Sequence, residues 1–196
     1  MKIVRFGFIF GITLSLSCNT NTPSVKTKLP IADTTSFFPV GNFFKSQVQY
    51  VELRNFYLYK ITVKDGKKDS SRLSKEEFKL WAHTFLDRDN SASTKKSMYK
   101  ESVFHDLSTH SYTINYASVN KNIDVQNVAV LLDEETNNVK RVFIRTILTR
   151  GDTAIIEQSS WKAFKSFQVN RALKTNDGYS STEYTYINWN DSHNEK

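Results

Sequence analysis

The second half of the sequence constrains the fold most narrowly, because it is a nearly continuous series of short segments rich in aromatic and β-branched residues. Residues of this kind favour β-strands. Asn, Asp, Ser and Gly, which favour turns, separate the segments, as in Arg150-Gly151-Asp152. No long helices alternate with the segments, so the pattern predicts an antiparallel rather than a parallel sheet. The expected strands are 101–108, 111–119, 124–132, 139–149, 153–162, 165–173 and 182–189.

Two further strands and a helix are expected before this region. Apolar residues at helical spacing predict a helix over about 40–53. The aromatic and β-branched run 56–63 predicts a strand, and Asp65-Gly66 predicts a tight hairpin turn after it. The segment 67–71, KKDSS, has almost nothing to bury, so it is expected to form an edge strand.

The clearest helix signal lies at 73–86. Ser74 is the expected N-cap, and Glu77 stands three residues later, which completes a capping box. Leu73 precedes the cap and is placed to pack against Phe78. Apolar residues then recur at intervals of three and four, which predicts one broad face packed on a sheet. This face consists of Phe78, Trp81, Ala82, Phe85 and Leu86.

Together these elements predict an α+β fold. We expect a curved antiparallel sheet of about six to eight strands, with one or two helices packed on one face. The segment 37–190 is long enough for a single hydrophobic core, so it is expected to form one domain, followed by a polar tail at 191–196.

The first eighteen residues, MKIVRFGFIFGITLSLSC, have the organisation of an export signal. Lys2 and Arg5 are followed by an apolar run of about eleven residues, which is too short to cross a bilayer as a helix. Ser17 and Cys18 end the segment. It resembles the signal of bacterial lipoproteins, which implies removal of residues 1–17 and attachment of lipid to Cys18. The alternative is ordinary secretion, because Ser15-Leu16-Ser17 is also a small-x-small cleavage pattern. The sequence has one cysteine and therefore no internal disulfide partner, which favours lipidation.

The segment 18–36 is rich in Thr, Ser, Asn and Pro, and it is expected to be a flexible tether after the lipidated cysteine. Such a tether reaches about 20–25 Å. The absence of Asp after Cys18 resembles the pattern of lipoproteins sorted to the outer membrane. The resemblance therefore implies a lipid anchor in the cell envelope, at the outer membrane and facing the periplasm.

The charge of the chain limits its partners. The formal net charge is +7, and removal of Lys2 and Arg5 leaves +5. Export separates the protein from nucleic acid, so nucleic acid is not an expected partner. Anionic lipid headgroups and acidic polymers of the envelope are the available counterparts for this charge. The alternative is that the charge only keeps the domain soluble.

The strand at 139–149 has two dissimilar faces. Val142, Ile144 and Leu148 form an apolar face, whereas Arg141, Phe143 and Arg145 line the opposite face. If that second face is open, its guanidinium groups and aromatic ring are suited to an anionic polymer or glycan. The alternative is an ordinary exposed sheet face, on which the arginine stems cover neighbouring aromatics and pair with Glu157 on the next strand.

Other chemistry has little support in the sequence. His105, Asp106 and His110 are close enough along a hairpin to bring two imidazoles and a carboxylate together, but no fixed-spacing metal motif such as HExxH is present. No motif for a nucleophilic enzyme or a phosphate-binding loop is found, and no cofactor or metal is expected.

The sequence therefore predicts a non-enzymatic lipoprotein that binds a protein or glycan. The alternatives are an envelope hydrolase with an unrecognised site, or a structural or assembly lipoprotein.

Overall fold

A computed structural model describes residues 37–90 and 93–190. The expected signal peptide at 1–17, the lipid attachment site Cys18, the tether at 18–36 and the tail at 191–196 all lie outside these described residues. They remain predictions.

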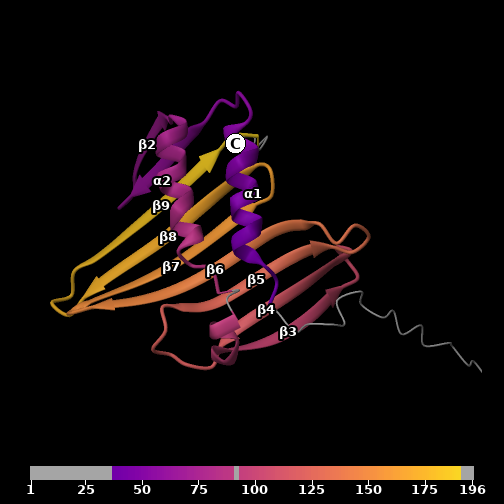
Figure 1. Ribbon diagram of the computed structural model, residues 1–196. Helices are drawn as coiled ribbons and strands as arrows, with labels where there is room; N and C mark the ends of the chain where they lie inside the picture. Colours follow the sequence, from indigo (N-terminus) through magenta and orange to yellow (C-terminus); the bar gives the residue numbers. More distant parts are fainter. Residues whose placement is uncertain (1–36, 91–92, 191–196) are drawn as a thin grey trace, which may run out of the picture. The chain divides into compact units, whose positions relative to one another are not determined.

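Within the described residues, nine strands form one antiparallel sheet in the order β2-β1-β9-β8-β7-β6-β5-β4-β3 (Figure 1). This confirms the expected α+β class with an antiparallel sheet and helices on one face. All nine segments predicted as strands join this one sheet, which is therefore one strand larger than the six to eight expected for it. β1 pairs with the C-terminal strand β9 and so joins the β1–β2 hairpin to the other seven strands. The strands are β1 (Tyr59–Lys64), β2 (Lys67–Arg72), β3 (Tyr99–Asp106), β4 (Ser111–Ser118), β5 (Val125–Asp133), β6 (Val139–Arg150), β7 (Thr153–Lys162), β8 (Ser166–Thr175) and β9 (Ser180–Asn188).

The β1–β2 hairpin forms as the sequence predicts. Asp65 and Gly66 occupy its turn with φ angles of 47° and 81°. Positive φ at both central residues is the requirement of the tight turn that matches the twist of two paired strands. Every residue of β2 is exposed, and β2 is an edge of the sheet. Its lysines and other polar side chains protect that edge from pairing with another chain.

Two α-helices pack on one face of the sheet (Figure 1). They are α1 (Val40–Glu52) and α2 (Lys75–Leu86), close to the helices predicted at 40–53 and 73–86. The capping box at the start of α2 is confirmed. The Glu77 N–H donates to Ser74 Oγ at 3.1 Å, and the Ser74 N–H donates to Glu77 Oε2 at 2.8 Å. These bonds satisfy backbone donors that the first turn of a helix leaves free.

Aromatic side chains fill the space between the helices and the sheet. Trp161 of β7 is fully buried, and its ring centroid lies 5.4 Å from that of Phe44 in α1 and 5.0 Å from that of Phe85 in α2. Phe167 of β8 lies 4.7 Å from Trp161. Burial of several large rings in one cluster supplies much of the apolar area that stabilises a domain of this size. The cluster also fixes which face of the sheet is the core.

Trp81 departs from the expected packing. The buried face of α2 consists of Phe78, Ala82 and Phe85, whereas Trp81 is only partly buried. The ammonium group of Lys60 in β1 lies 5.8 Å from the centre of the Trp81 ring. Trp81 therefore lies at the margin of the core, where a wide ring keeps one side in contact with solvent or a cation.

Past α2 the chain enters a short 3-10 helix, η1 (Ser93–Met98), which leads into β3 and was not predicted. Within the part of the chain that the structure describes, no helix has the length and apolar character needed to cross a membrane.

Candidate functional site

The two faces of β6 differ as the sequence predicts. Val142 and Ile144 are buried on the face that the helices cover. Phe143 is 42% exposed and Arg145 is also exposed, on the opposite face. Leu148 is only partly buried, so the apolar face of β6 is less covered near its C-terminal end.

We call the sheet face opposite α1 and α2 the open face, since no described helix packs against it. The antiparallel register places its residues in rows across β6, β7, β8 and β9. One row contains Phe143, Ser160, Gln168 and Tyr186, and the next contains Arg145, Gln158, Asn170 and Tyr184. In each row, a residue of β6 stands at one end and a tyrosine of β9 at the other. The side chains between them, from β7 and β8, carry amide or hydroxyl groups.

Two guanidinium groups of the open face, those of Arg141 and Arg145, come from β6. Neither Arg141 nor Arg145 pairs with a carboxylate in the described ranges 37–90 and 93–190. The Arg141 guanidinium carbon lies 5.6 Å from the centre of the Phe143 ring. A guanidinium group that lies over an aromatic ring is attracted to the ring face. Its N–H groups can still donate hydrogen bonds to a ligand.

The alternative pairing of these arginines with Glu157 is wrong. Glu157 lies opposite Thr146 in the register, and its side chain is on the face that the helices cover. Side chains alternate between the two faces of a strand, so Glu157 and Arg145 project from opposite sides of the sheet.

Tyr184 and Tyr186 belong to β9, three strands away from β6 on the open face. Their ring centroids are 6.5 Å apart and the ring planes differ by 6°. Tyr186 is 8% exposed, whereas Tyr184 is less buried. Burial raises the pKa of the Tyr184 hydroxyl above its usual value of 10.0. The hydroxyl therefore remains a neutral hydrogen-bond donor and acceptor at physiological pH.

Two hollows of this face lie beside the two rows. The larger has a volume of about 370 Å³, and its lining includes Val63, Ile156, Gln158, Asn170 and Tyr184. The smaller has a volume of about 110 Å³ and lies beside Arg141, Gln168 and the two tyrosines. Hollows of this size on an exposed sheet suit individual units of an extended ligand rather than one deeply enclosed molecule.

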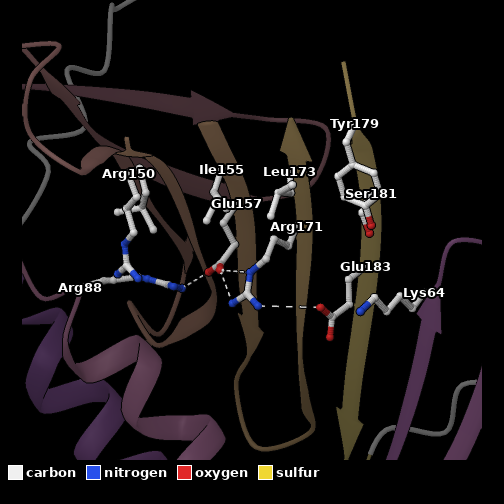
Figure 2. Close-up of a pocket in the computed structure, with 11 residues that line it drawn as sticks. Lys64, Arg88, Arg150, Ile155, Glu157, Arg171, Leu173, Tyr179, Ser181 and Glu183 are labelled. Atoms are coloured by element: carbon white, nitrogen blue, oxygen red, sulfur yellow. Dashed lines mark hydrogen bonds and ion pairs between the residues drawn. The ribbon is translucent and has the colours of Figure 1, made fainter. Parts of the chain in front are cut away.

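The opposite face carries a larger cavity, of about 440 Å³ (Figure 2). Figure 2 shows Glu157 between Arg88 and Arg171, with Glu183 and Lys64 farther along the same wall. Arg88 follows the end of α2, whereas the other four residues come from β7, β8, β9 and β1. We call this space the Glu157 cavity.

Glu157 is fully paired although it is 1% exposed. Arg171 donates to its Oε2 from Nη2 at 2.8 Å and from Nε at 3.1 Å. Arg88 Nη1 forms an ion pair with its Oε1, and Ser159 Oγ donates to the same oxygen at 3.1 Å. A buried carboxylate needs such partners, because the loss of its hydration is not otherwise offset.

His105 and His110 come together around a carboxylate, but not around Asp106 as expected. His105 Nε2 lies 2.9 Å from Glu134 Oε1, and His110 Nδ1 lies 3.0 Å from Glu134 Oε2. The carboxylate between the imidazoles is therefore Glu134 rather than Asp106. Asp106 instead accepts hydrogen bonds from Ser108, which hold the β3–β4 turn. No group of residues able to hold a metal ion is found within the described ranges.

Both carboxylates of the Glu157 cavity face guanidinium groups, with Glu183 Oε2 at 3.8 Å from Arg171 Nη1.

Comparison with models of protein families, with curated protein sequences and with solved structures gave no match to this chain.

The Glu157 cavity was not predicted from the sequence, although one signal was available. Glu157 occupies a core-facing position of β7, two residues after Ile155 and four before Trp161. A carboxylate at such a position requires a cationic partner from another element. The partner Arg88 comes from a distant loop, which strand alternation does not reveal.

Proposed function

We propose that this protein is a lipid-anchored envelope protein that binds an acidic glycan through the open face of its sheet. The observation that carries the proposal is the pair Arg141 and Arg145, which flank Phe143 on the open face of β6 and have no ion-pair partners in the described residues. Guanidinium groups without carboxylate partners remain available to an anionic ligand, which they bind in a bidentate manner.

The rows beside β6 favour a glycan over other acidic partners. Gln158 and Asn170 are exposed next to Arg145, and each amide group both donates and accepts hydrogen bonds. Sugar hydroxyl groups also both donate and accept hydrogen bonds, so they can pair with these amides. Phe143 offers a ring face to the apolar side of a sugar, as aromatic residues do at binding surfaces. An acidic protein surface is the second partner that the same charges would accept.

The spacing of the arginines fits a repeating anion. Arg145 lies four positions after Arg141 along the strand, which corresponds to about 13 Å. Both side chains project from the same face, since residues two and four apart along a strand do so. A single small anion does not reach both groups, whereas two acidic units of one polymer do.

The proposed anchor is consistent with this assignment, because it would hold the protein in the envelope, where acidic polymers are available. The proposed lipid on Cys18 and the tether at 18–36 would hold the domain near a membrane surface while leaving its orientation free. Cys18→Ser is expected to abolish acylation and to release the protein from the membrane fraction. If the variant and the parent remain in the membrane fraction to the same extent, lipid attachment at Cys18 is contradicted.

Retention on immobilised oligogalacturonate, compared with a neutral glucose oligomer, tests the binding proposal. The full chain is expected to bind the acidic oligomer more tightly, and binding should weaken as salt rises, because exposed charges are screened within about 8 Å at physiological ionic strength. Arg141→Ser/Arg145→Ser should lose this binding without a large change in melting temperature.

Lys45→Ser/Lys67→Ser is the matched control, because it removes the same charge from exposed positions on α1 and β2. Equal losses in the two double variants would show that only net charge matters. Binding of an acidic peptide, but not of the acidic oligomer, would assign the face to a protein partner instead.

A further inference from the structure

The Glu157 cavity lies on the helix-covered side of the sheet, near the strand ends that carry the β6–β7 and β8–β9 turns (Figure 2). It is separate from the open face and from the proposed glycan surface, because Arg150 and Glu157 project from the face opposite Phe143 and Arg145. Its volume of about 440 Å³ falls in the range of sites for small organic ligands.

Cations exceed carboxylates in the lining of this cavity. Lys64, Arg88, Arg150 and Arg171 carry positive charge, against Glu157 and Glu183. Arg150 has no ion-pair partner within the described residues. The lining therefore carries a formal charge of +2, which a bound anion would balance.

Glu157 fixes two of these cations in place. Arg88 is 14% exposed and directs Nη1 to Glu157 and to Ser159 Oγ, the latter at 3.1 Å. Within the described ranges its Nε and Nη2 groups have no hydrogen-bond acceptor. A guanidinium held at one edge and free at the other is preorganised for a second anion, because little side-chain freedom is lost when that anion binds.

The rest of the lining is apolar or carries hydroxyl groups. Leu148, Ile155 and Leu173 contribute an aliphatic wall, and Figure 2 shows Tyr179 and Ser181 near Leu173. Ser181 Oγ donates to Asp65 at 3.0 Å, which holds that edge of the cavity. A ligand that contacts both parts needs an anionic head and an apolar body.

We propose that the Glu157 cavity binds a small amphiphilic anion, with a carboxylate or phosphate group against Arg88 and Arg150 and a short aliphatic chain against Leu148, Ile155 and Leu173. A free organic acid and the phosphate monoester of an alcohol share this chemistry. This inference goes beyond the glycan proposal, since it concerns the other face and another ligand.

Calorimetric titration of the full chain with hexanoate, hexyl phosphate, hexanol and inorganic phosphate tests the site. At least one of the two amphiphilic anions is expected to bind about tenfold more tightly than both hexanol and inorganic phosphate, because only such an anion uses the charged and the aliphatic parts together. Which of them binds more tightly identifies the head group. Equal binding of hexanol, or no binding of either anion, would overturn the proposal.

Arg150→Gln tests the charged part without disturbing Glu157, and it is expected to weaken binding of the preferred anion about tenfold. Arg145→Gln is the matched control, because it removes the same charge from the opposite face of the same strand. An equal loss in both variants, or none in Arg150→Gln, would contradict the site.

Leu173→Ser tests the aliphatic part of the cavity. It should weaken binding of the amphiphilic anion while leaving that of inorganic phosphate unchanged, and equal effects on both ligands would contradict the aliphatic wall.

Discussion

Arg88, in the loop that follows α2, forms an ion pair with Glu157 in the middle of β7. This contact joins the helical layer to the sheet at the point where the aromatic core ends, beyond Trp161. Because Arg171 binds the other carboxylate oxygen, Glu157 links α2, β7 and β8 through one buried charge. The cluster is therefore expected to matter for both stability and the shape of the cavity.

Glu157→Gln is expected to destabilise the protein by about 3–5 kcal/mol, because it leaves two guanidinium groups without their buried counter-charge. Urea denaturation of the parent and the variant measures the difference. Glu135→Gln, in the exposed β5–β6 turn, is the control and should change stability by less than about 0.5 kcal/mol. A loss below about 1 kcal/mol for Glu157→Gln would contradict the role assigned to this carboxylate.

Because Trp81 lies at the margin of the core, its replacement by alanine should destabilise the protein less than the replacement of Phe85. Phe85→Ala should cost about 3–5 kcal/mol, since Phe85 is fully buried against Trp161 and Phe167. Trp81→Ala should cost less, below about 3 kcal/mol, because Trp81 is only partly buried. Thermal unfolding of both variants compares them. A larger loss for Trp81→Ala would place Trp81 in the core instead.

Hydrogen bonds from Ser108 and Thr109 lower the pKa of Asp106 from 3.8 to about 2. A carboxylate whose pKa is lower in the folded state stabilises that state fully above its unfolded pKa of 3.8, and this contribution is lost as the pH falls toward 2. The stability difference between the parent and Asp106→Asn should therefore shrink through this window. Urea denaturation at a series of pH values measures this difference in the free energy of unfolding. A difference that grows toward low pH would contradict a lowered pKa of Asp106 in the folded state.

The strands could be predicted from the sequence because their signals are local. Alternation of side chains in 139–149 and the turn residues around it determine both β6 and its two faces, and the capping box of Ser74 and Glu77 determines the start of α2. The same alternation brings Arg141, Phe143 and Arg145 onto one face.

The remaining features depend on contacts between segments far apart in the chain. The pairing of β1 with β9 joins Tyr59 to Asn188, and nothing near either residue in the sequence specifies the other. Arg88 and Glu157 meet for the same reason, through the docking of α2 on the sheet. His105 and His110 meet at Glu134 rather than at Asp106, because the β3–β4 turn uses Asp106 for its own hydrogen bonds. Strand periodicity determines a face but not the partner across the sheet.

The most direct test of the glycan proposal is chemical-shift mapping of the isotope-labelled full chain during titration with a short oligogalacturonate. We expect the signals of four open-face residues to move together with increasing ligand, namely those of Phe143, Arg145, Gln158 and Asn170. The signals of Phe78 and Trp161 under the helices should stay in place. Shifts confined to α1 and α2, or none on the open face at saturating oligomer, would contradict the assignment of this face as the glycan-binding surface.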